Sequence, residues 1–157
     1  MGGGALIDGG VHTFNIFHQV GGPISEVFCM QPPKMKNEMQ GEDTTFTLMK
    51  FKNGGVGAYD YSWSIPHAPK SPYFQVQGTM GTLYDMDGLF LVEHNQEKIK
   101  LSLPQGISDS YDWMMEDFVD CILNNKEPRM TGTMGKQDIT VALAAYESAK
   151  TGKCITL

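Results

Sequence analysis

An Asn-Gly-Gly turn between two alternating segments is the feature that most constrains the fold of this chain. Residues 45–52 and 56–65 flank Asn53-Gly54-Gly55. Asn-Gly between such runs indicates a β-hairpin, because both central residues of the tightest hairpin turn take positive φ. Since successive side chains of a strand point to opposite faces, one face of the second strand is predicted to be aromatic and aliphatic. Its members are Tyr59, Tyr61, Trp63 and Ile65.

Further short strands and three helices are predicted along the rest of the chain. Turn signals at Gly78–Gly81 and Asp87-Gly88 separate strands in a meander. The strands are expected at residues 24–30, 73–77, 82–86, 89–93, 98–103 and 154–157. Apolar residues at helical spacing predict helices over residues 5–20, from Ser110 to a stop before Pro128, and around a stripe of Ile139, Ala142, Leu143, Tyr146 and Ala149.

This order of elements predicts the fold class. Helices at both ends of a run of strands favour an α+β fold, in which an open, mostly antiparallel sheet carries helices packed on one face. The other face, expected to be the one rich in Tyr and Trp, would be left for a partner. A length of 157 residues fits a single domain over residues 1–157.

Composition narrows the possible partners and the compartment. Lys and Arg number 12 against 18 Asp and Glu, giving a net charge of −6, and no basic run offers a site for nucleic acid or an anionic membrane. No apolar stretch approaches the roughly 20 residues of a membrane-spanning helix. Cys29, Cys121 and Cys154 are odd in number and far apart, so neither a disulfide framework nor a zinc site is indicated. We expect a soluble, cytoplasmic protein.

A narrow polar stripe marks the first predicted helix. Its members, which lie within about 60° of one another at about 100° per residue, are Asp8, His12, Asn15 and Gln19. A carboxylate one turn before an imidazole can orient the ring and support its charged form, so His12 could accept a proton near neutral pH. The same spacing also describes a helix-surface pair worth about 0.2–0.5 kcal/mol, or two ligands of a metal site that has no third. Gly9 and Gly10 suggest close approach by another backbone or a ligand.

Other motifs for cofactors or nucleophiles are incomplete. Residues 132–137 (GTMGKQ) lack the spacer and hydroxyl residue of a phosphate-binding loop. Gly55-Val56-Gly57 begins a predicted strand, whereas a dinucleotide fingerprint opens a helix. No Gly-x-Ser-x-Gly elbow is present. The sequence therefore shows no nucleotide-binding unit and no hydrolase nucleophile.

Residues 2–12 (GGGALIDGGVH) resemble the start of the catalytic helix in the glucose-fructose oxidoreductase, inositol dehydrogenase and rhizopine-catabolism family (Gfo/Idh/MocA) of NAD(P)-dependent enzymes. Three glycines, Asp8, Gly10 and His12 fall in register. The hairpin at Asn53-Gly54, residues 78–83 (GTMGTL) and residues 145–152 (AYESAKTG) extend the similarity over nearly the whole chain.

The resemblance covers only the second domain of such enzymes. It implies a substrate-binding and oligomerisation domain that follows a Rossmann domain, which this sequence lacks, so the chain is expected to be a fragment. It also implies that His12 is the general acid/base on a substrate hydroxyl, with Asp8 as its partner. Asn15 stands where family members often carry Asp, and as an amide it would hydrogen-bond substrate. His67 and Trp113 are weaker candidates for substrate binding.

Two functional hypotheses follow from these residues. The first is the catalytic-helix domain of a dehydrogenase of sugars, cyclitols or related polyols, which uses NAD or NADP in the full-length parent. It implies no cofactor for this chain alone, which is expected to be inactive, and association into a homo-oligomer through the open sheet face. The alternative is a noncatalytic ligand-binding or oligomerisation module, supported by the aromatic strand face of Tyr59, Tyr61 and Trp63.

Overall fold

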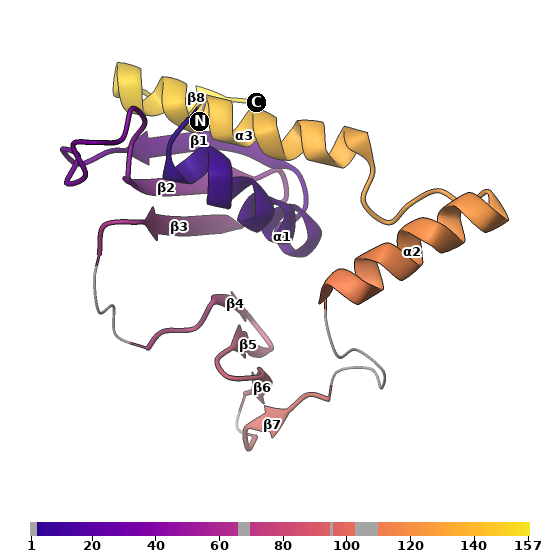
Figure 1. Cartoon of the computed structure of the whole chain (residues 1–157). Coiled ribbons are helices and arrows are strands. Elements are labelled where there is room, and N and C mark those ends of the chain that lie inside the picture. Colours follow the sequence, from indigo (N-terminus) through magenta and orange to yellow (C-terminus); the bar gives the residue numbers. More distant parts are fainter. Residues whose placement is uncertain (1–2, 66–69, 95, 103–109) are drawn as a thin grey trace. The chain divides into compact units, whose positions relative to one another are not determined.

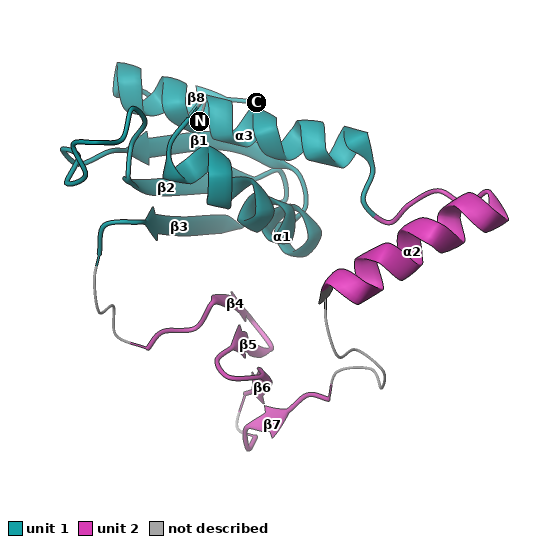
Figure 2. Ribbon diagram, in the orientation of Figure 1, with its two compact units in different colours: residues 1–66, 130–157 teal, residues 67–129 magenta. Residues whose placement is uncertain are grey.

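The computed structural model of the chain describes residues 3–65, 70–94, 96–102 and 110–157. The chain forms two compact units, one of residues 1–66 with 130–157 and one of residues 67–129 (Figure 2). A single domain over residues 1–157 stays a prediction. No helix among the described ranges is long and apolar enough to cross a membrane.

The first unit is one sheet with helices on one of its faces (Figure 1). Its four strands are antiparallel in the order β3-β2-β1-β8. They are β1 (Ile24–Met30), β2 (Thr44–Phe51), β3 (Val56–Ser62) and β8 (Ile155–Thr156). The helices are a π-helical turn η1 (Leu6–Gly10), α1 (Val11–Gly21) and α3 (Gly132–Thr151). The predicted α+β class is therefore confirmed.

The β2–β3 hairpin forms where it is expected, but its turn is wider than the two-residue turn suggested by Asn-Gly. Gly54 takes a φ of 91°, whereas Asn53 keeps a negative φ. The amide of Gly54 donates to the Phe51 carbonyl at 3.0 Å, and the amide of Phe51 donates to the Gly55 carbonyl at 2.8 Å. The Asn53 side chain accepts from the Gly55 amide and donates to the carbonyl of Gly21, the last residue of α1. The turn thus also holds the end of that helix.

The core lies between the sheet and the helices. Alternate residues of β2 are buried, while Phe46 and Leu48 between them are exposed. Small residues on α3 let this helix approach β1, where Ser148 Oγ accepts from the Cys29 amide at 2.9 Å. The face of α3 that is buried differs from the predicted stripe, because Ile139 and Leu143 are exposed. The buried residues of this helix are Asp138, Val141, Ala142, Ala144, Ala145 and Ser148.

The aromatic face of β3 is the covered face of the sheet, so its assignment to the open face is wrong. Tyr59 meets Phe14 of α1 edge-on at 5.7 Å between ring centroids, and its hydroxyl accepts from Thr13 Oγ1 at 3.3 Å. Tyr61 stacks on Tyr59 and meets Trp63 edge-on. The predicted alternation is confirmed, but alternation alone does not say which face the helices cover. The uncovered face carries Phe46 and Leu48.

The second unit has its own sheet, so the predicted strands form two sheets and not one, and the strands of the predicted meander lie together in the second sheet. Its antiparallel order is β4-β5-β6-β7. The strands are β4 (Phe74–Gly78), β5 (Gly81–Asp85), β6 (Leu89–Glu93) and β7 (Ile99–Lys100), followed by α2 (Ser110–Asn124). Asp87 and Gly88 both take positive φ in the β5–β6 turn, as Asp-Gly predicts. The apolar residues of α2 fall at helical spacing but are exposed: Tyr111, Met114, Met115, Phe118 and Ile122.

Candidate functional site

The first helix begins with a π-helical turn. Residues 6–10 form η1, and an α-helix continues from Val11 to Gly21, whereas the sequence predicts one uniform helix over residues 5–20. Gly22, with a φ of 79°, ends the helix by donating its amide to the His18 carbonyl, as the glycine pair predicts. π-Helical turns are rare and occur frequently at functional sites. This one carries Asp8 directly before the turn that bears His12.

Asp8 and His12 are both exposed at this end of the helix. Neither side chain makes a hydrogen bond or an ion pair with another residue in the described part of the chain. Their side chains are therefore available to a ligand, and their place is set by the helix backbone that carries them. The pairing of Asp8 with His12 stays a prediction.

The other half of the predicted stripe is engaged in hydrogen bonds. Asn15 Nδ2 donates to Asp138 Oδ2 of α3 at 3.0 Å, and Asn15 Oδ1 accepts from Gln19 Nε2 at 2.5 Å. His18, which lies outside the predicted stripe, places Nδ1 at 2.7 Å from Asp138 Oδ1. These contacts give Asn15 a role in joining α1 to α3. Contact between Asn15 and a substrate stays a prediction.

Asp138 is the residue of this network that sequence reasoning missed. It is only 4% exposed and lies on the buried face of α3, one turn before Val141 and Ala142. A carboxylate on an apolar helix face requires hydrogen-bond donors, and that pattern in the sequence was a usable signal. Because an ionised carboxylate only accepts, the hydrogen between it and His18 belongs on Nδ1.

The start of η1 is held by two residues that are distant in sequence. Glu42 Oε1 accepts from the Leu6 amide at 2.7 Å and from the Tyr146 hydroxyl at 3.1 Å. The same hydroxyl accepts from the Ile7 amide at 3.2 Å. Burial and the charge of Glu42 raise the pKa of Tyr146 to about 12. The tyrosine therefore keeps its proton and can donate it to the carboxylate.

The glycines inside this helix make room for side chains of the same unit. A Cβ on Gly9 would collide with the ring and hydroxyl of Tyr61, and a Cβ on Gly10 would lie 2.8 Å from the Leu6 side chain. The predicted approach of another backbone is wrong at both positions, because the groups that approach these glycines are side chains. Approach by a ligand stays a prediction.

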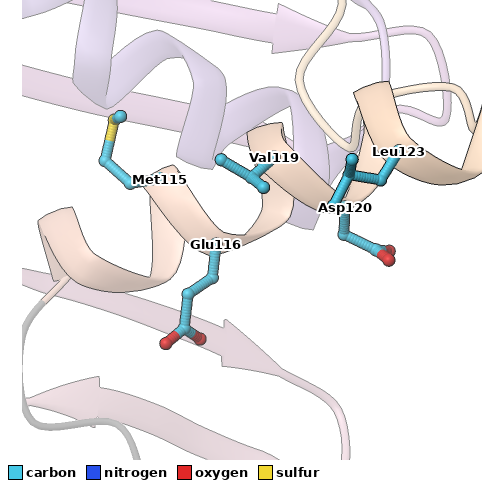
Figure 3. Close-up of a pocket in the computed structure, with 5 residues that line it drawn as sticks. All are labelled: Met115, Glu116, Val119, Asp120 and Leu123. Carbon is cyan, nitrogen blue, oxygen red and sulfur yellow. The ribbon is translucent and has the colours of Figure 1, made fainter.

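The weaker candidates lie elsewhere. His67 lies outside the described residues. Trp113 belongs to α2 of the second unit, where Arg129 lies over its ring at 5.3 Å from the centroid. A surface hollow of about 370 Å³ runs along α2 between Met115 and Leu123 (Figure 3) and contains none of the predicted site residues. Within the described ranges no cluster of three or more His, Cys, Asp or Glu could hold a metal ion.

The start of η1, within the described part of the chain, does not fit the phosphates of a dinucleotide. A phosphate would need the free amides of a glycine-rich helix start, and Gly2-Gly3-Gly4 before η1 provide the glycines for one. There the Leu6 amide already donates to the Glu42 carboxylate, whose negative charge would also repel a phosphate. The described residues therefore offer no nicotinamide-cofactor site at this helix.

Comparison with known proteins gives one family and a consistent set of folds. The model described as "Oxidoreductase family, C-terminal alpha/beta domain" (Gfo/Idh/MocA) matches residues 1–157. Aldose-aldose oxidoreductase from Caulobacter crescentus, solved with glycerol, matches 99% of this chain with a TM-score of 0.85 at 19% identity.

Two further solved structures agree in fold. An oxidoreductase from Agrobacterium radiobacter in complex with NAD+, L-tartaric acid and magnesium matches 96% of the chain with a TM-score of 0.78 at 20% identity. The WlbA dehydrogenase from Bordetella pertussis, with NADH and UDP-GlcNAcA, matches 99% with a TM-score of 0.70 at 18% identity. The chain covers 48%, 48% and 46% of these three proteins, so it spans about half of their length.

Proposed function

Because the chain belongs to the Gfo/Idh/MocA oxidoreductase family as its C-terminal alpha/beta domain, we propose that it is the substrate-binding and catalytic-helix domain of a longer NAD(P)-dependent oxidoreductase. The substrate class is a sugar, cyclitol or related polyol. The observation that supports this proposal is the exposed Asp8–His12 end of a helix whose other polar residues are held by Asp138. Of the three solved proteins named above, one is described with glycerol, one with L-tartaric acid and one with UDP-GlcNAcA. All three ligands carry hydroxyl groups.

His12 is proposed to take the proton of the substrate hydroxyl when the carbon that bears it is oxidised. An imidazole titrates near neutral pH and can pass a proton in either direction. Asp8, on the preceding turn, supports the positive charge that His12 then carries. A nicotinamide cofactor would be held by the part of the longer protein outside this chain, and it would supply the hydride acceptor.

Kinetics of the full-length protein test this assignment. We expect His12→Ala to lower kcat by roughly 10²- to 10⁴-fold, the usual contribution of a positioned acid/base. Asp8→Asn should lower kcat less and shift the pH–rate profile. The matched control is His94→Ala, since His94 is an exposed histidine of the second unit. A His12→Ala protein that folds and keeps the wild-type kcat would show that the helix is not catalytic.

A second role, self-association through the open sheet face, is favoured by a separate observation. The uncovered face of the first sheet presents large apolar side chains that are about half exposed or more: Met30, Phe46, Leu48 and Val56. Contiguous apolar surface of this kind is typical of an interface, and a second copy of this chain would cover it with the same residues.

Sedimentation of the chain tests the interface. The wild type should form a dimer or larger species, and Leu48→Asp should produce monomers. Val20→Asp on α1, where the side chain is 50% exposed, should leave the association unchanged. A wild-type chain that stays monomeric at tens of micromolar would contradict self-association through this face.

A further inference from the structure

Three successive amides at the start of η1, from Ala5 to Ile7, are satisfied by groups from distant parts of the chain. A helix start leaves about four amides without partners, and here Ala5 makes no side-chain cap. The Ala5 amide donates to the Glu42 carbonyl at 2.9 Å, and the Leu6 amide donates to the Glu42 carboxylate. The Ile7 amide donates to the Tyr146 hydroxyl. Three successive amides are thus held by two residues, one from the segment before β2 and one from α3.

The glycines next to this cluster are explained by the position of Glu42. A Cβ on Gly4 would collide with the Glu42 carboxylate and with its carbonyl oxygen. A Cβ on Gly41 would lie 2.5 Å from the backbone of Gly3 and Gly4. Any larger residue at position 4 or 41 would push the two segments apart, and Glu42 would then lose the Leu6 amide. The glycine run before the helix therefore serves this cap, in which a negative carboxylate also complements the helix dipole.

We propose that Glu42 and Tyr146 are positioning residues that hold the π-helical turn and thereby fix the place of Asp8 and His12. The proposal rests on the proposed function of His12. Asp8 and His12 make no hydrogen bond to other described side chains, so only the backbone of η1 and α1 can set their place. A π-helical turn is less favourable than an α-helical one and persists where the surrounding structure holds it. Without the cap, the first turn is free to fray or to wind as an α-helix, which shifts Asp8 relative to His12.

Amide hydrogen exchange by NMR on the 157-residue chain tests the cap itself. Tyr146→Phe removes the acceptor of the Ile7 amide, and Glu42→Gln weakens the acceptor of the Leu6 amide. We expect exchange of the affected amide to rise about tenfold or more, together with changes in the backbone chemical shifts of residues 6–10. The Cys29 amide, which donates to Ser148, reports whether the α3–β1 contact is intact. Glu26→Gln is the control for Glu42→Gln, and Tyr73→Phe, at an exposed tyrosine, is the control for Tyr146→Phe.

Kinetics of the full-length protein test the positioning. Both variants should lower kcat about tenfold or more while KM changes little. The loss of kcat should appear even where the variant has the thermal stability of the wild type. If Glu42→Gln fails to fold, Tyr146→Phe, which keeps the ring and removes one oxygen, decides the question. Unchanged exchange at Leu6 and Ile7, or unchanged kcat in variants whose amides do exchange faster, would overturn the inference. If His12→Ala also leaves kcat unchanged, the proposed function fails, and this result is distinct from failure of the positioning inference alone.

Discussion

Removal of the Asp138 carboxylate should destabilise the first unit by about 2–4 kcal/mol. Asp138 is 4% exposed and accepts from His18 Nδ1 at 2.7 Å and from Asn15 Nδ2 at 3.0 Å. Hydrogen bonds to a charged group contribute about 1.5–3 kcal/mol each. Asp138→Ala loses both bonds, but it also removes a buried charge whose desolvation opposes folding. The side chain of His18 is 16% exposed, so water can reach part of the imidazole, and the net loss falls below the sum of the two bonds.

Denaturant unfolding followed by fluorescence can measure this loss in one unit. Trp63 belongs to the first unit and Trp113 to the second, so a Trp113→Phe background leaves Trp63 as the reporter. Glu26→Ala is the matched control, because Glu26 pairs with Lys50 on the surface of the same unit. Such an exposed pair contributes at most about 1 kcal/mol.

Asp138→Asn divides the effect between the two partners. An amide offers one acceptor oxygen, so either His18 or Asn15 loses its acceptor. The stability of Asp138→Asn should therefore lie between the stabilities of wild type and Asp138→Ala. A loss for Asp138→Ala within about 0.5 kcal/mol of the Glu26→Ala control, at an unchanged denaturant slope, would refute the claim that Asp138 ties α1 to α3.

Two further predictions concern acid stability and cofactor binding. The amides of Lys36 and Met35 donate to the Asp43 carboxylate and help to lower its pKa to about 2. Because this folded-state pKa lies below the ordinary value of 3.8, the carboxylate contributes stability above about pH 4 that is lost as the pH falls through about 2. The stability advantage of wild type over Asp43→Asn, measured by urea unfolding at several pH values, should therefore shrink from pH 5 to pH 2; a constant difference would contradict it. The isolated chain should not bind NADH, since Glu42 occupies the amides of its glycine-rich helix start, and saturable micromolar binding in a fluorescence titration would show that a nucleotide site was missed.

The fold was predictable because its strands and turns have local causes. Alternation and the Asn53-Gly54 signal placed the β2–β3 hairpin, and Asp87-Gly88 placed the β5–β6 turn. The division of the strands into two sheets was not predictable, since no local pattern states which strand pairs with which. For the same reason the aromatic face of β3 was assigned to the open side. The alternation gives two faces, and only the packing of Phe14 against Tyr59 decides which one is covered.

The candidate site divides in the same way. Asp8 and His12 lie on the helix that their spacing predicts, whereas Glu42, Tyr146 and Asp138 were not found. These three residues act through the backbone or through another side chain. They lie 36, 139 and 123 positions away from the groups that they hold, so no helical period relates them to the stripe.

The helix that carries His12 is held at three points along its length. Glu42 and Tyr146 hold its start, Asp138 holds its middle through Asn15 and His18, and Asn53 Nδ2 donates at 3.0 Å to the carbonyl of Gly21 at its end. An exposed side chain with no hydrogen-bond partner of its own keeps a defined place only if its backbone is fixed in this way. The end anchor holds Gly21, more than two helical turns after His12, so its loss in Asn53→Ala should leave His12 in place. The start anchor holds the amides of Leu6 and Ile7, directly before Asp8. If the helix serves catalysis, the loss of kcat on removing each anchor should therefore be largest for Glu42, smaller for Asp138 and smallest for Asn53.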